Sequence, residues 1–289
     1  MTELRIGGVP EHFNWPWQRV IDGGELAALG VAARWTDFPD GSGAMIAALE
    51  EDRLDVAMLL TEAAVAGIAR RGRYRIVSLY TESPLLWGVH VPAGSAFTSV
   101  DELRNARFAI SRLGSGSHLM SYVLARERGW PADGLRFVTV KTLEGAVAAF
   151  EAGEADVFLW EKLMTKPLVD AGKFRRVGEL AAPWPGFVAC ATARALTEKR
   201  DAVRAAIEGV CRAAARVAAD PSSPAAIAAR YGLREPDVAE WLRTTRWATR
   251  PAIDDAVVER VSEVLRELRL VDAPVPPSAA IAREALPGL

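Results

Sequence analysis

Residues 47–77 read AALEEDRLDVAMLLTEAAVAGIARRGRYRIV, and residues 148–177 read AAFEAGEADVFLWEKLMTKPLVDAGKFRRV, which repeats the same pattern. Each segment predicts a helix, a short turn with an aspartate, a buried strand, a second helix and another strand. Gene duplication or shared fold geometry would explain the match, and both predict two similar lobes rather than one large sheet. The matching positions are Ala47, Leu49, Asp55 and Val56 with Ala148, Phe150, Asp156 and Val157, and Gly72, Arg75 and Val77 with Gly172, Arg175 and Val177.

Strand and helix patterns alternate on both sides of the repeat, which predicts an α/β architecture. We expect lobe 1 to begin with residues 1–90, lobe 2 to comprise residues 91–187, and residues 188–289 to complete lobe 1. Proline and glycine place the two crossovers between lobes near Val89–Ala93 and Pro185–Ala189. Helices expected at about 197–219, 224–231, 235–245 and 254–269 would pack back on lobe 1.

Composition excludes several classes of protein. The chain has 289 residues, 50% of them hydrophobic, and a formal net charge of -2. This length suits two lobes, and a nucleic-acid partner would require a basic excess that is absent. No apolar run is long enough to span a membrane. The N-terminus, MTELRIGGVP, lacks the features of a secretory signal, so we expect a cytoplasmic protein, or a periplasmic one if a leader has been removed.

No pattern of metal ligands, cofactor-binding residues or catalytic nucleophiles stands out. Cys190 and Cys211 have no metal spacing and are expected to be small buried residues. His12, His90 and His118 are far apart in the sequence, whereas a metal site needs three or four convergent ligands. We therefore expect no metal, no cofactor and no assigned catalytic residue.

Several blocks resemble the type 2 periplasmic-binding-protein fold of nitrate, sulfonate, taurine and thiamine-precursor binding proteins. They are the opening strand with its aromatic loop, FPDGSGAMIAALEEDRLDVAMLLTE, SPLLWGVHV, RFAISRLGSGSHLMSYVLA, FLWEKLMTKPLVDAGKFRRVGE and PWPGFV, which span roughly residues 4–190. The last two blocks resemble most a substrate-binding-like subgroup without an agreed ligand. The cysteine-rich iron motif of relatives that make the thiamine pyrimidine is absent.

The resemblance implies two α/β lobes around a hinged cleft that closes on a small ligand, anionic or planar and heterocyclic. It implies an ABC permease as partner if the protein is exported. The alternative is a cytoplasmic enzyme on the same fold, such as a menaquinone-pathway-like lyase, with Glu62, Glu161, Lys162 or His118 as general acid or base. A transcription factor is a weaker alternative, because no helix-turn-helix segment precedes lobe 1.

Ligands of α/β lobes bind beyond the carboxyl ends of the strands, where helix N-termini present N–H groups. The loop LGSGSH at Leu113–His118 fits this role, because small residues permit close approach and its serines add hydroxyl groups. The same serines would cap the helix whether or not a ligand binds. A similar loop of small residues lies at Gly41–Gly43 in lobe 1. From these two loops we expect ligand contacts from Ser42, Arg112, Ser115, Gly116, Ser117 and His118.

A second group of candidates lies where apolar strands give way to polar residues. In lobe 2 the apolar strand VFLW ends at Trp160 and runs into Glu161 and Lys162; the counterparts in lobe 1 are about Leu59, Leu60 and Thr61, with Glu62 next. We expect Trp160 to line the cleft beside a Glu161–Lys162 charge pair, and a core position for Trp160 is the competing interpretation. Trp15, Trp87 and Trp184 are further expected aromatic contacts, whereas Trp35, Trp130, Trp241 and Trp247 fit the core.

Overall fold

The computed structural model describes residues 1–283 and divides the chain into two compact units. Unit 1 comprises Met1–Pro84 and the chain from Trp184 onward, and unit 2 comprises Leu85–Pro183. The expected first crossover, Val89–Ala93, lies instead at the end of β5 (Pro84–Pro92), a strand of the unit 2 sheet. The Pro, Gly and Ser residues that prompted that expectation come mostly after this strand has ended.

Unit 1 holds a five-stranded sheet in the order β2-β1-β3-β10-β4. Its strands are β1 (Thr2–Gly8), β2 (Val31–Asp37), β3 (Val56–Leu60), β4 (Tyr74–Leu79) and β10 (Phe187–Thr192). β1 pairs in parallel with β2 and β3, whereas β10 runs antiparallel to β3 and β4. The central strand β3, VAMLL, is almost wholly buried, which explains why its apolar residues form a continuous run.

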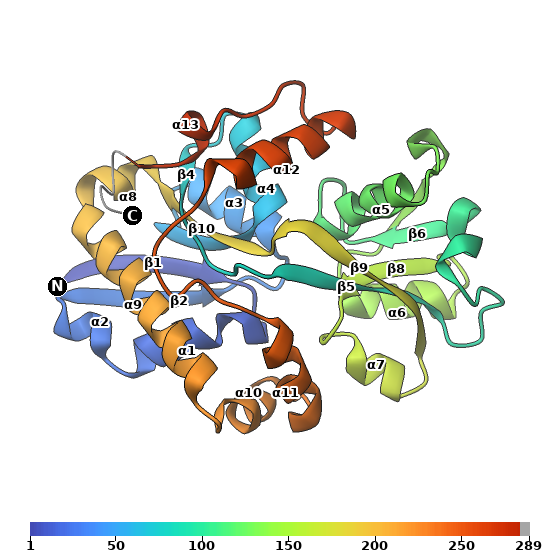
Figure 1. Cartoon of the computed structure of the whole chain (residues 1–289), viewed down its shortest axis with the longest axis horizontal. Coiled ribbons are helices and arrows are strands. Elements are labelled where there is room, and N and C mark those ends of the chain that lie inside the picture. Colours follow the sequence, from blue (N-terminus) through green and yellow to red (C-terminus); the bar gives the residue numbers. More distant parts are fainter. Residues whose placement is uncertain (284–289) are drawn as a thin grey trace. The chain divides into compact units, whose positions relative to one another are not determined.

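Helices pack on this sheet in two groups. From β1 the chain moves outward to β2 and then back to β3, so right-handed connections place the intervening helices on opposite faces. One group contains α1 and α9, and α9 lies across β1 and β2; the other contains α3, α4 and α12 (Figure 1). The helices are α1 (Trp15–Asp22), α2 (Glu25–Ala28), α3 (Ser42–Glu50), α4 (Thr61–Ala69), α8 (Ala193–Glu198), α9 (Arg200–Ala219), α10 (Ser223–Tyr231), α11 (Glu235–Thr244), α12 (Asp255–Glu267) and α13 (Pro277–Ala280), with a 3-10 helix, η1, at His12–Asn14.

Unit 2 repeats the plan of unit 1 with the order β7-β6-β8-β5-β9. Its further strands are β6 (Arg107–Ile110), β7 (Arg136–Thr139), β8 (Val157–Glu161) and β9 (Phe174–Pro185). Its helices are α5 (Gly116–Glu127), α6 (Leu143–Glu151) and α7 (Lys166–Asp170), with 3-10 helices η2 (Val100–Asn105) and η3 (Ala132–Gly134). In each sheet order the fourth strand, β10 in unit 1 and β5 in unit 2, is the strand that the chain enters when it arrives from the other unit. This fourth strand runs antiparallel to the third strand of its sheet, β3 or β8.

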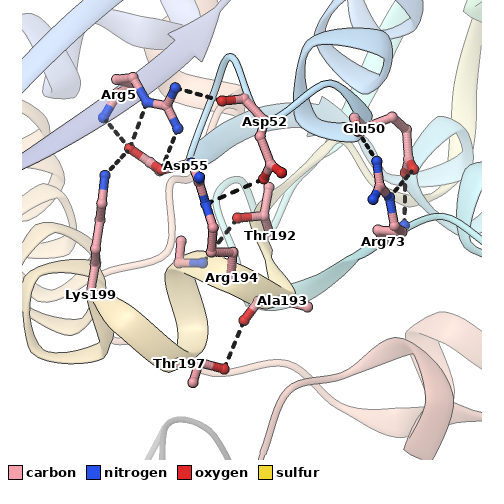
Figure 2. A network of polar contacts seen from close by, with 11 residues as sticks. Arg5, Glu50, Asp52, Asp55, Arg73, Thr192, Ala193, Arg194, Thr197 and Lys199 are labelled. Carbon is pink, nitrogen blue, oxygen red and sulfur yellow. Dashed lines mark hydrogen bonds and ion pairs between the residues drawn. The ribbon is translucent and has the colours of Figure 1, made fainter.

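An arginine–aspartate clamp recurs at the same place in each unit. The backbone N–H and guanidinium of Arg5 in β1 donate to Asp55, just before β3, at 2.8–3.0 Å. Arg107 in β6 donates in the same way to Asp156, just before β8, at 2.7–2.9 Å. In unit 1, Lys199 adds a third donor to Asp55, as Figure 2 shows. The aspartates aligned by the sequence repeat thus hold the second strand of the sheet order to the third in both units, β1 to β3 and β6 to β8.

Candidate functional site

The carboxyl edge of the unit 1 sheet gathers several of the predicted ligand-binding residues. Because β1, β2 and β3 are parallel, their carboxyl ends lie at one edge, and the chain there enters α1, α3 and α4. Ser42 and Thr61 begin α3 and α4, and both are buried. The Leu60 N–H donates to the Ser42 hydroxyl at 3.1 Å, and the Thr61 hydroxyl donates to the Pro185 carbonyl at 2.6 Å. Both hydroxyls therefore stabilise the backbone at the carboxyl edge of the sheet.

Glu62 and Trp184, predicted as separate site residues, are direct partners in unit 1. The Trp184 indole N–H donates to Glu62 Oε2 at 2.8 Å, and both side chains are buried. No ion pair joins Glu62 to a cation within residues 1–283. Burial raises the pKa of the Glu62 carboxyl to about 7, because desolvation penalises its charged form and the indole only partly offsets this. A carboxyl in this state is suited to proton exchange or to receiving a ligand's hydrogen bond.

The loop that follows β1 contains a polar residue that the sequence prediction overlooked. Asn14 is buried, and its side-chain amide donates to the Val9 carbonyl at 2.7 Å, but its Oδ1 has no hydrogen-bond partner among the described residues. The neighbouring Trp15, which was predicted, is only half-buried and has the Arg19 guanidinium over its ring. The signal available in the sequence was an asparagine just before a helix that begins WPW.

Aromatic residues from α11 and from the segments that follow β4 and α11 hold this loop in place. The rings of His12 and Trp241 meet edge to face at 4.3 Å, and burial lowers the pKa of His12 to about 3. Tyr80 and Trp247 both donate to the Phe13 carbonyl, at 2.7 and 2.8 Å. Trp241 and Trp247 are therefore core residues, as expected, and their function is to fix the loop after β1.

In unit 2 the predicted LGSGSH loop follows β6 and opens α5, a twelve-residue helix that begins at Gly116. The Ser115 hydroxyl accepts from the His118 N–H at 3.3 Å, and the Ser117 hydroxyl accepts from the Ser111 N–H at 3.0 Å. His118 Nδ1 accepts from the Gly114 N–H at 3.0 Å, and burial lowers the pKa of His118. The capping prediction is confirmed for Ser115.

These contacts fix the conformation of the loop before α5. The first N–H groups of a helix have no acceptor within it, and Ser115 takes only that of His118. The N–H groups of Gly116 and Ser117 therefore point along the axis of a positive helix end. Beside them Arg112 is half-buried and Leu113 is 73% exposed, an unusual exposure for a leucine.

The residues at the end of β8 differ from their prediction. Glu161 and Lys162 do not pair with each other: Glu161 accepts from the Met164 N–H at 2.7 Å, whereas Lys162 pairs with Glu179 at 2.9 Å. Successive side chains of a strand point to opposite faces, so Glu161 and Lys162 leave the end of β8 in different directions and each finds its own partner. The expected Glu161–Lys162 pair is thus wrong as a contact.

The tryptophans of unit 2 are more deeply packed than expected. Trp160 stacks on Phe158 with ring centroids 5.1 Å apart and packs against the core cluster of the unit, although it is only half-buried. Trp87 is buried in β5, where it stands opposite Glu161. These positions neither establish nor exclude a ligand contact, so the ligand contacts expected of Trp160 and Trp87 stay predictions.

Across residues 1–283, no three or more His, Cys, Asp or Glu side chains are grouped so that they could hold a metal ion. In the same part of the chain, no helix combines the length and the apolar character that a membrane crossing requires.

Comparison with known proteins identifies the fold. A family model described as Ca3427-like PBP matches residues 87–180, and no curated protein matches the chain. The CA3427 gene product of Candida albicans, described as having the generic periplasmic binding protein fold, superposes with a TM-score of 0.91 at 23% identity over 97% of this chain and 96% of that one.

Two sulfonate-binding proteins have the same architecture. The alkanesulfonate-binding protein SsuA of Xanthomonas axonopodis pv. citri, solved with MOPS, gives a TM-score of 0.81 at 19% identity over 97% of this chain and 98% of its own. The aliphatic sulphonate binding protein SsuA of Escherichia coli gives 0.76 at 19% identity over 97% and 92%. Together with the two five-stranded sheets of matching order, these similarities show that the chain has the type 2 periplasmic-binding-protein fold.

Proposed function

We propose that this protein binds a small polar molecule with an anionic group, and that the N-terminus of α5 receives that group. The observation that carries the proposal is the braced loop Ser111–His118, whose serines and histidine accept hydrogen bonds from the loop's own N–H groups. A loop fixed in this way holds the N–H groups of Gly116 and Ser117 in place before any ligand arrives. Such preorganised N–H groups at a helix N-terminus are a general anion site.

The comparisons support the same class of ligand. Two of the similar structures are described as sulfonate-binding proteins, and one of them was solved with MOPS, which carries a sulfonate. A sulfonate is a compact anion with three acceptor oxygens, which suits a helix end with several N–H donors. If the chain is exported, an ABC permease would be its partner.

A pair of glycine variants tests the proposal. Gly116→Val places a branched side chain beside the N–H groups of α5, whereas Gly94→Val adds the same side chain in open space elsewhere in unit 2. We expect propane-1-sulfonate to raise the melting temperature of the wild type and of Gly94→Val, because a ligand that binds only the native state stabilises it. Gly116→Val should lose this rise. An equal rise in both variants would contradict binding at α5.

An enzyme on the same fold is the second candidate, and Glu62 favours it. Its carboxyl has a pKa of about 7, which suits a general acid or base at neutral pH. The two functions differ in the fate of the bound compound. Proton NMR of protein mixed with excess of a tightly bound compound would show that compound unchanged for a binding protein, and progressively converted for an enzyme, with conversion abolished in Glu62→Gln.

A further inference from the structure

Unit 1 contains a groove at the end of α4 that is remote from the carboxyl edge of the sheet. The groove has a volume of about 350 Å³ and lies between residues 68–70, where α4 ends, and residues 269–276, which follow α12. α4 and α12 pack side by side (Figure 1). α4 begins at the carboxyl edge with Thr61, so its two ends belong to different sites. A volume of this size is at the lower end of the range for small-molecule pockets.

The inside of the groove is apolar, and its wall is fixed. Its apolar side chains include Ile68, Leu270, Val271 and Val275. The Ser262 hydroxyl of α12 accepts from the Val275 N–H at 3.2 Å and donates to the Val275 carbonyl at 3.4 Å. The prolines on either side of Val275 restrict the backbone further. A wall held in this way does not have to be ordered when a ligand binds.

Two arginines supply positive charge at the groove. Arg70 ends α4 and Arg269 follows the end of α12, and both line the groove and are exposed. Within residues 1–283, neither side chain takes part in a hydrogen bond or an ion pair. Asp272 is the only carboxylate among the described residues that line the groove, so positive charge is in excess there. Guanidinium groups bind carboxylates through paired hydrogen bonds.

The backbone at Arg269 shows that an arginine is not the best residue there for stability. Its φ is 57°, the left-handed conformation that glycine adopts more readily after the end of a helix. Arg71 has the same position after α4, with a φ of 68°, but it is not among the residues that line the groove. The two arginines are therefore a matched pair that differs in contact with the groove.

We propose that this groove binds a medium-chain carboxylate, with a chain of about eight carbons, as a second ligand of the protein. Arg70 and Arg269 receive the carboxylate, and the chain covers the apolar side chains of the groove from water. Charge complementarity selects an anion, and the apolar surface selects a molecule with a chain. The site goes beyond the proposed function, because none of its residues belongs to the loop Ser111–His118.

Three compounds test the ligand class by calorimetry at pH 7. Octanoate has both the chain and the charge, octan-1-ol has the chain alone, and butyrate has the charge with a short chain. We expect octanoate to bind about tenfold or more tightly than either of the others, a difference of about 1.4 kcal/mol. Gly116→Val should bind octanoate as the wild type does, which separates this groove from α5.

Two glycine variants connect the binding to the groove. Arg269→Gly and Arg71→Gly should each raise the melting temperature by about 2–4 °C, because glycine adopts the left-handed conformation without strain. Only Arg269→Gly should also weaken octanoate binding, by about fivefold or more. Arg70→Gln should weaken it to a similar extent.

Octanoate that binds no more tightly than octan-1-ol or butyrate would overturn the inference. Equal octanoate affinity in Arg269→Gly and Arg71→Gly would also overturn it, and would leave both arginines the role of offsetting the negative C-terminal ends of their helices. Loss of octanoate binding in Gly116→Val would place octanoate at α5 and would contradict a separate site in unit 1.

Discussion

At the scale of single residues, each unit contains an arginine–aspartate clamp, and the two clamps differ in burial. The Asp55 side chain is fully buried and receives both Arg5 and Lys199, whereas Asp156 is 23% exposed and receives Arg107. The two guanidinium contacts are otherwise alike. Comparing the two aspartates therefore measures how much burial changes the contribution of the same hydrogen-bonding pattern to the free energy of unfolding.

We expect Asp55→Asn to lower the free energy of unfolding by about 3 kcal/mol, because it removes a fully buried carboxylate that two half-buried cations share. Asp156→Asn should cost about 1 kcal/mol, since water solvates the released arginine. Urea denaturation at pH 7 measures both. Equal losses in the two variants would contradict the role assigned to burial.

The Arg5 and Lys199 contacts also give Asp55 a pH dependence of known sign. They lower its pKa to about 2, below the usual 3.8, although burial acts in the opposite direction. A carboxyl with a depressed pKa stabilises the folded state above its unfolded value and loses this contribution as the pH falls. Acid should thus weaken the wild type between about pH 4 and 2 more than it weakens Asp55→Asn.

The pH dependence of stability that Glu62 contributes has the opposite sign. Its folded pKa is about 7, above the ordinary 4.5, so the folded state binds the proton more tightly than the unfolded state. Stability from this group is complete below pH 4.5 and falls as the pH rises to about 7, by roughly 3 kcal/mol at 1.36 kcal/mol per pKa unit. We expect Glu62→Gln to lack this fall, so the variant should gain stability relative to the wild type between pH 5 and 8. Thermal unfolding across this range measures the gain, and parallel curves would contradict it.

At the scale of secondary-structure elements, α5 and α6 provide a matched pair of helix caps in unit 2. The Ser115 hydroxyl accepts from the His118 N–H, and the Thr142 hydroxyl accepts from the Gly145 N–H at 3.1 Å. Alanine at either position should cost about 1 kcal/mol of stability, the usual contribution of an N-cap. Only Ser115→Ala should also weaken the binding of propane-1-sulfonate. Calorimetry and urea denaturation of both variants test this, and an equal loss of affinity would show that α5 has no special role.

Trp160 at the end of β8 has two possible roles, a ligand contact or a core residue, and the variant Trp160→Ala distinguishes them. A ligand contact predicts that Trp160→Ala weakens binding by about 1–3 kcal/mol with little change in melting temperature. A core role predicts a loss of about 3–5 kcal/mol of stability and unchanged affinity. Its stacking on Phe158 and half-buried position make a stability loss near the lower end of that range our expectation. Fluorescence that is unchanged on addition of ligand would remove Trp160 from the site.

Local sequence patterns predict these elements well, because their signals are local. The helix that begins within LGSGSH, the buried strands VAMLL and VFLW, and the long C-terminal helices α9 to α12 lie close to where periodicity and capping residues place them. The contacts of Asn14 and Glu62 could not be predicted in this way. Both depend on partners brought by the fold, such as Trp184, which is 122 positions from Glu62 in the sequence.

At the scale of the whole molecule, two units of one plan are built from a chain that passes between them twice. Their sheets have matching orders, β2-β1-β3-β10-β4 and β7-β6-β8-β5-β9. The repeat at residues 47–77 and 148–177 predicts this duplication. It does not predict that β10 and β5 each insert into their sheet as the fourth strand, because the order of strands distant in the sequence leaves no periodic pattern in it. The same insertion moves the unit boundaries to Pro84 and Pro183.

Native mass spectrometry tests the central claim, that this fold here serves to bind a small anionic molecule, most directly. Wild type and Gly116→Val would each be incubated with the small-molecule fraction of a cell extract, desalted and sprayed from volatile buffer. We predict one adduct per wild-type chain, released on denaturation as a compound with an anionic group, and none on Gly116→Val. A wild-type chain without an adduct, or an adduct held equally by the variant, would contradict the claim.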